Sequence, residues 1–173
     1  MRNGKAKKIA YMGVMLSLII VLSLLERLLP PLPMAPPGVN LGLSNIIIMY
    51  CSFFIGIKPA FGLAALKSIF VAFTRAPVAG YLSLCGGLLS VLIISILLIV
   101  YKRKISYVAV SICGAVAHNM GQVIAASAIS SAGILYYIPA LIVMGIIMGI
   151  VTGITLTVLL PVFHRIIGSG WNR

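Results

Sequence analysis

The chain has 173 residues, of which 62% are hydrophobic and only 8% are charged, and its mean hydropathy is +1.22. Soluble domains carry about 25% charged residues, so a water-soluble protein is excluded. The formal net charge is +12, and Glu26 is the single acidic residue. The chain therefore lacks the carboxylates that would hold magnesium at a diphosphate or serve as a pair in acid–base catalysis. We expect no enzymatic activity.

The positive charge has its own meaning, because the basic residues lie at the ends of apolar segments. This arrangement favours lipid headgroups over nucleic acid as the partner. His118 and His164 lie far apart and have no companion ligands, so no metal or cofactor is expected.

Six segments are long and apolar enough to cross a membrane, which takes about 20 residues. They cover residues 9–29, 41–57, 59–76, 78–101, 105–132 and 134–167. Turn signals such as PPLPMAPPG separate them. The first segment resembles a signal peptide, but no small-x-small cleavage site follows it cleanly, so we expect it to be retained. The prediction is an all-α membrane protein, a compact six-helix bundle forming a single domain.

The basic residues also predict the orientation, because cytoplasmic loops are enriched in Lys and Arg. With six crossings, one side receives Arg2, Lys5, Lys7, Lys8, Lys58, Lys102, Arg103, Lys104, Arg165 and Arg173. The other side receives Arg27 and Arg75. We therefore expect a multi-pass protein of the plasma membrane with both termini in the cytoplasm.

The second segment opens with PPGVNLGLSN, which joins a turn to a helix start. Asn40 and Ser44 share a helical face, and Asn45 lies near them. A helix N-terminus that bears such residues can receive an anion. Plain capping of the helix by Asn40 explains this residue equally well. Asn45 lies deeper, where a pocket or a packing role is expected.

The third segment carries Lys67 near its midpoint and Arg75 at its outer end. Lys67 could extend to an interface, but its central position makes that a long reach. We expect no acid to pair with it, because Glu26 is placed near the outer edge of another helix. Lys67 is therefore a candidate for a ligand pocket. Arg75 is either an interfacial anchor or a second ligand contact.

The fifth segment contains GAVAHNMGQ, with His118 and Gln122 one helical turn apart. Gly114 and Gly121 lie on the same side, and Asn119 lies about 100° away from His118. Hydrogen bonds between packed helices would explain one such polar residue. Three together favour a ligand site, because intramembrane polar groups usually face a cavity.

Glycines in the fourth and sixth segments favour close helix contact. The fourth carries Gly86, Gly87 and Ser90. The sixth carries Gly145, Gly149 and Gly153 at four-residue spacing, for packing within the bundle or for docking a partner. Cys51, Cys85 and Cys113 are expected to be small buried hydrophobic residues.

Three stretches together resemble a known family: PPGVNLGLSNI, LSLCGGLLSVLI and GAVAHNMGQ. It is the Gx transporter family, also labelled heptaprenyl diphosphate synthase component I. That family is similar in size and layout to the S components of energy-coupling factor (ECF) transporters. The matching motif residues are Asn40, Leu41, Gly42, Asn45, His118, Asn119 and Gln122. Lys67 falls where the family tends to place a basic residue.

The resemblance implies an S-component-like bundle that captures a small ligand at its outer face. A transmembrane coupling protein and two cytoplasmic ATPases would then drive its release inward. S components often dock through an Ala-x-x-x-Ala face on the first helix. Here Ala10, Gly13 and Ser17 offer small residues without that spacing.

The leading hypothesis is a substrate-binding subunit for an anionic or amphipathic ligand. The candidate ligand residues are Asn40, Asn45, Lys67, Arg75, His118, Asn119 and Gln122. Two alternatives stay open. One is a non-catalytic accessory protein for isoprenoid or quinone metabolism or a redox assembly, and the other is a self-contained carrier.

Overall fold

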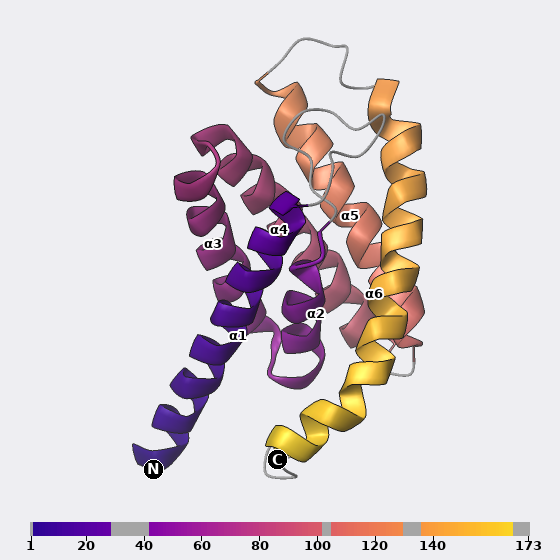
Figure 1. The fold of residues 1–173 in the computed structure, drawn as a ribbon. Coiled ribbons are helices and arrows are strands. Elements are labelled where there is room, and N and C mark those ends of the chain that lie inside the picture. Colours follow the sequence, from indigo (N-terminus) through magenta and orange to yellow (C-terminus); the bar gives the residue numbers. More distant parts are fainter. Residues whose placement is uncertain (1, 29–41, 102–104, 130–135, 168–173) are drawn as a thin grey trace.

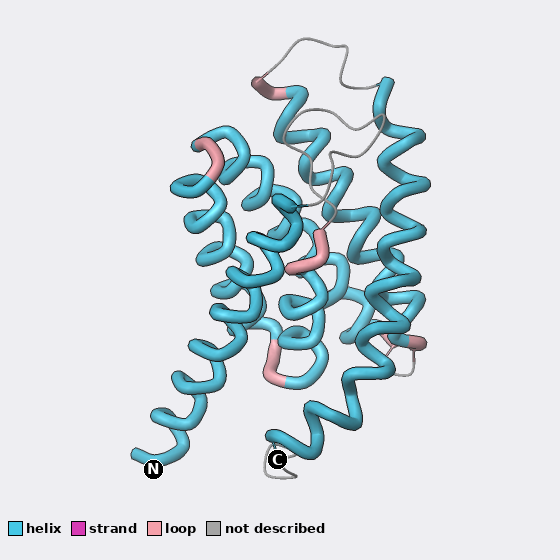
Figure 2. Tube along the Cα trace, viewed as in Figure 1, coloured by secondary structure: helices cyan, strands magenta, loops and turns pink. Residues whose placement is uncertain are grey.

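The computed structural model describes residues 2–28, 42–101, 105–129 and 136–167. These residues form helices and no strand. The helices are α1 (Arg2–Leu28), α2 (Asn45–Phe54), α3 (Ile57–Thr74), α4 (Pro77–Val100), α5 (Tyr107–Ser127) and α6 (Ile138–Ile167) (Figure 1). Where the connections are described, they are short turns (Figure 2). The all-helical architecture is therefore confirmed for this part of the chain.

Five of these helices, all except α2, are long and apolar enough to cross a membrane. Their outer surfaces carry large apolar side chains, such as Phe73, which is 88% exposed, and Ile99, which is 68% exposed. Water would penalise such a surface, whereas lipid tails would solvate it. The described helices thus indicate a multi-pass membrane protein.

The prediction for residues 41–57 was wrong in length, because α2 covers only ten residues. A helix of this length spans about 15 Å, half of the hydrocarbon core. Gly42 and Gly56 flank it with φ of +83° and +138°, conformations that glycine adopts without a Cβ clash. Eight of its residues are buried, and it contacts all five other helices. The second segment is therefore the core of the bundle.

The outer helices follow one another as a row, in which α3 packs on α4, α4 on α5, and α5 on α6. Glycines bring the last three close together. A Cβ on Gly149 would lie 2.4 Å from Cα of Ile112, and one on Gly121 would lie 2.8 Å from the Cys85 carbonyl oxygen. By contrast, α1 contacts only α2 and α3 among the described helices. The row is closely packed, and within the described residues α1 contacts it through α3 alone.

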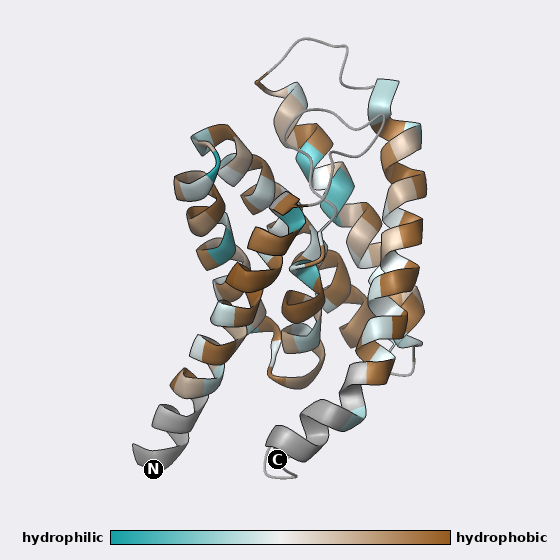
Figure 3. Cartoon of the chain, in the orientation of Figure 1, coloured by the Kyte–Doolittle hydropathy of each residue, from teal (hydrophilic) through white to brown (hydrophobic). Residues whose placement is uncertain are grey.

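Hydrophilic segments of four helices lie in the same half of the bundle. The first turn of α1 and the last turn of α6 lie at the same end (Figure 1). Hydrophilic segments of α1, α2, α3 and α5 gather in the other half (Figure 3). The coloured hydrophilic segments of these four helices therefore belong to one region of the fold.

The cysteine prediction holds for one residue of the three. Cys51 is buried in α2, Cys85 is partly buried, and Cys113 is exposed. Around the axis of α5, Cys113 lies about 100° from Gly114 and about 140° from His118, both of which are buried in the bundle. Its apolar character therefore suits the outer surface of the helix.

Candidate functional site

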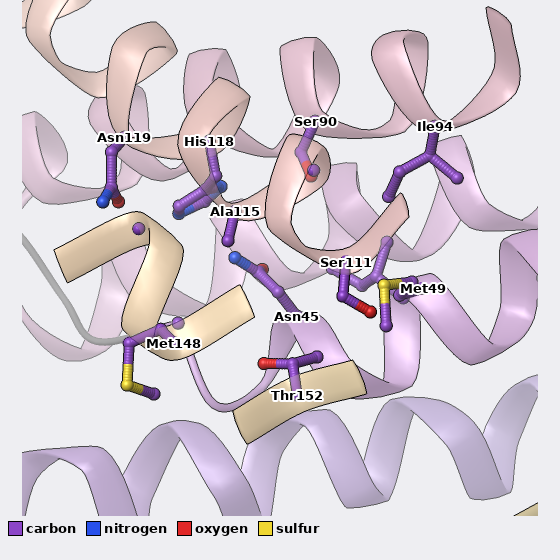
Figure 4. Close-up of a pocket in the computed structure, with 14 residues that line it drawn as sticks. Asn45, Met49, Ser90, Ile94, Ser111, Ala115, His118, Asn119, Met148 and Thr152 are labelled. Atoms are coloured by element: carbon purple, nitrogen blue, oxygen red, sulfur yellow. The ribbon is translucent and has the colours of Figure 1, made fainter. Parts of the chain in front are cut away.

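A small cavity lies inside the bundle between α2, α4, α5 and α6 (Figure 4). Its polar lining includes Asn45, Ser90, Ser111, His118, Asn119 and Thr152. Its volume is about 30 Å³. Because one water molecule needs about 10–15 Å³ of such space, the cavity holds about two. A larger ligand would require the helices to separate.

His118 and Gln122 carry buried polar atoms that have no partner in the described part of the chain. Their side chains are 2% and 1% exposed. Among the described residues, Nδ1 of His118 and both amide atoms of Gln122 make no hydrogen bond. Leaving such atoms unsatisfied costs about 1–3 kcal/mol each. Groups that are expensive to bury and lack a structural partner are candidates for binding a ligand.

Close contact between α4 and α5 fixes these side chains. A Cβ on Gly86 would lie 2.8 Å from the His118 carbonyl oxygen and 2.9 Å from Cγ of Gln122. The imidazole ring of His118 also interacts with the Gly86 backbone. Because Gly86 has no side chain, α4 can pack directly against both His118 and Gln122.

Asn119 has a different role in this geometry. Its Nδ2 donates a 2.7 Å hydrogen bond to the Leu141 carbonyl oxygen in α6. The side chain lines the cavity but is committed to joining α5 to α6. Of the three polar residues in the α5 motif, one connects helices and two hold unpartnered atoms.

Lys67 points into the bundle and is 5% exposed. Its ammonium donates a 2.7 Å hydrogen bond to Oδ1 of Asn45, the first residue of α2. Asn45 also lines the cavity, beside His118 (Figure 4). The charge of Lys67 acts on His118 as well. The structure thus brings Asn45, Lys67 and His118 into one neighbourhood.

The expectation that no acid lies near Lys67 was wrong. Glu26 is only 8% exposed, and its charge acts on the Lys67 ammonium. Its Oε1 accepts a 3.1 Å hydrogen bond from the backbone N–H of Ser44, just before α2. The turn that leads into α2 brings the backbone N–H of Ser44 close to Glu26. The sequence could not show this contact, because its apolar pattern predicts a second helix long enough to span the membrane.

Arg75 joins the same neighbourhood from the end of α3. Its charge acts on Lys67, and its Nη2 lies 3.5 Å from the Ser23 carbonyl oxygen in α1. The side chain is half-buried. Asn40 falls outside the described residues.

The family model described as "Heptaprenyl diphosphate synthase component I" matches residues 15–159. The chain belongs to this family. No match was found among curated proteins or among solved structures. The family assigned from the three sequence stretches is thereby confirmed.

The heptaprenyl diphosphate synthase component I family takes its name from an enzyme, yet this member has Glu26 as its only acid. In the structure that carboxylate accepts a hydrogen bond from the Ser44 N–H, and its charge acts on Lys67. The Glu26 carboxylate therefore interacts with other groups of the protein.

The two candidate docking faces of this family member differ in exposure. Gly145, Gly149 and Gly153 are buried against α5, which fills the groove that they form. The interpretation as an intermolecular face is corrected accordingly. Ala10, Gly13 and Ser17 are exposed on α1, where the Ser17 hydroxyl bonds its own helix at the Gly13 carbonyl.

Several residues of this region were missed in the sequence. Glu26 could have been suspected because it is the only acid in the chain. Ser111 lies seven residues before His118 and therefore on the same helical face. Thr152 and Ser23 gave no signal, since isolated hydroxyl residues are common in apolar helices.

Proposed function

We propose that this protein is a non-catalytic, membrane-embedded substrate-binding subunit of the S-component type, which captures a small anionic or amphipathic ligand. The observation that carries the proposal is the set of buried atoms on His118 and Gln122 that have no partner among the described residues. His118 lines the same cavity as Asn45, which is bonded to Lys67. Polar groups buried at this cost are retained where a ligand satisfies them.

The charge of the neighbourhood supports an anion. The Lys67 ammonium interacts with the charges of Glu26 and Arg75, and Glu26 is the only acidic residue of the sequence. The apolar part of the cavity, including Ile48, Met49 and Ile94, would accept a hydrocarbon or ring portion. The cavity of about 30 Å³ would have to enlarge to admit such a ligand.

The chain offers no phosphate-binding loop of the Gly-rich Lys-Ser/Thr type, so the energy for uptake would come from partners. We propose a transmembrane coupling protein and two cytoplasmic ATPases for this role, at the plasma membrane with both termini in the cytoplasm. The exposed small residues of α1 are the available docking face.

Native mass spectrometry of the protein in mild detergent tests the binding role. We expect a copurified small molecule on the wild type, and its loss from His118→Ala. Ser52→Ala is the matched control, because the buried Ser52 hydroxyl bonds its own helix and lies outside the cavity. A wild-type protein that carries only lipid and detergent, and that recovers no ATPase from native membranes, would overturn the proposal.

The family name favours a second candidate, a membrane accessory to an isoprenoid enzyme. In that role the cavity would hold a prenyl chain for a soluble synthase. Affinity purification from native membranes separates the two candidates. Recovery of a prenyl synthase without ATPases would favour the accessory role, and recovery of ATPases with a coupling protein would favour uptake.

A further inference from the structure

The N-terminus of α2 lies inside the bundle, and the anionic group next to it is the Glu26 side chain. The N–H groups of Asn45 and Ile46 bond to the carbonyls of Gly42 and Leu43. The N–H of Ser44 is directed instead to the Glu26 carboxylate, 3.1 Å away. A helix N-terminus carries a partial positive charge, and interrupted helices in membranes direct such ends at anionic groups.

The same helix end has a buried cation beside it. Lys67 is bound to Asn45, the first residue of α2, and its charge interacts with Glu26 and Arg75. Two basic side chains therefore act near Glu26, which is the single acid of the sequence. This excess of basic groups favours an anion at the start of α2.

Two hydroxyl groups near this point have no partner among the described residues. Ser44 Oγ and Ser23 Oγ are on residues that are 0% and 3% exposed. Ser44 also supplies the N–H that Glu26 receives, and Ser23 lies one turn before Glu26 in α1. The Ser44 hydroxyl is therefore a further donor at the start of α2 that no described residue uses.

We propose that the α2 N-terminus, with Lys67, is an oxyanion seat that Glu26 fills in the ligand-free state, and that a carboxylate or phosphate group of the ligand displaces Glu26 from it. This inference rests on the proposed binding function and deepens it. Glu26 is then a resident competitor of the ligand. Displacement would move α1, which contacts only α2 and α3 among the described helices, while the α4–α6 row stays intact.

Emptying the seat tests the proposal by chemical rescue. The full-length Glu26→Ala protein in detergent should unfold at a lower temperature than the wild type. Added acetate or inorganic phosphate should raise its Tm by about 3 °C at ten times the Kd, whereas chloride at equal ionic strength should not. The wild type should respond only at higher anion concentration, because Glu26 competes. Met15→Ala, at another buried position of α1, should lose stability without any rescue.

A second pair of variants keeps the proposal falsifiable if Glu26→Ala does not fold. Glu26→Gln retains the shape and should bind phosphate about tenfold more tightly than the wild type, and Lys67→Met should bind it more weakly. Weaker phosphate binding in Glu26→Gln would overturn the displacement. Glu26→Ala that responds equally to acetate and chloride would overturn the seat.

Two further arms separate the sources of the oxyanion and the two proposals. In nanodiscs, rescue of Glu26→Ala by phosphatidylglycerol, but not by phosphatidylcholine or soluble phosphate, would assign the seat to a lipid headgroup. If a copurified ligand depends on His118 but no anion rescues Glu26→Ala, the seat fails and the binding function stands. If anions bind but no ligand copurifies, the uptake role fails and the seat stands.

Discussion

The Lys67 ammonium and Oδ1 of Asn45 lie 2.7 Å apart, so a lysine from the middle of α3 is bonded to the first residue of α2. This contact excludes the alternative in which Lys67 extends to a membrane interface. It also places a cation where the short central helix begins. Glu26 in α1, Asn45 in α2 and Lys67 in α3 therefore depend on one another electrostatically, in a way that apolar packing alone would not create.

Replacing Lys67 should show that dependence. Lys67→Met removes the hydrogen bond to Asn45 and leaves the Glu26 carboxylate facing a weaker positive field. The Oδ1 atom of Asn45 would then lose its buried hydrogen-bond donor, which typically costs about 1–3 kcal/mol. We expect thermal unfolding in detergent to begin at a clearly lower temperature, and ligand binding to be lost.

The double variant Lys67→Met/Glu26→Gln is the control, because it removes both charges together. We expect it to recover much of the lost stability, with a coupling of about 0.5–3 kcal/mol. If the two losses simply add, the interaction between Lys67 and Glu26 contributes nothing to folding.

Asn119 and Gln122 provide a test that separates packing from binding within one helix. Asn119→Leu removes the 2.7 Å bond to the Leu141 carbonyl. In membrane proteins such interhelical bonds contribute about 0.6–1.7 kcal/mol, so stability should fall. Ligand binding should change less than stability.

Gln122→Met should behave in the opposite way. Its amide has no partner among the described residues, so an apolar side chain of similar length removes an unsatisfied group at little cost. We expect unchanged or higher stability with loss of the copurified ligand. A fall in stability with the ligand retained would instead make Gln122 a packing residue.

The sequence was a good guide to composition-driven features and a poor guide to depth. The helical membrane architecture could be predicted from the lengths of the apolar segments. The spacing of His118 and Gln122, one helical turn apart, predicted that they lie on the same face of a helix. The central position of α2 could not be predicted, because residues 41–57 contain enough apolar residues for a span. The helix start is set by Gly42, whose φ of +83° is visible only in three dimensions.

The proximity of Glu26 to Lys67 was missed for the same reason. Periodicity shows which residues share a face of one helix, but not which helices meet. Once α2 is known to begin within the bundle, the N–H of Ser44 becomes available to Glu26. The roles of Gly145, Gly149 and Gly153 were open in the sequence because an exposed groove and one filled by α5 have the same spacing.

The glycine contact between α5 and α6 yields the last prediction. Gly149→Ala should destabilise the protein, since its Cβ would lie 2.4 Å from Cα and 2.9 Å from N of Ile112. Backbone cannot move aside as a side chain can, so the helices must separate, at a cost of about 1–3 kcal/mol. Gly62→Ala in α3 is the matched control, because a Cβ there meets nothing within 4 Å. We expect a lower Tm for Gly149→Ala, and an equal or higher Tm for Gly62→Ala because alanine favours helix. Equal stability of both variants would show that α5 and α6 are not in the close contact described.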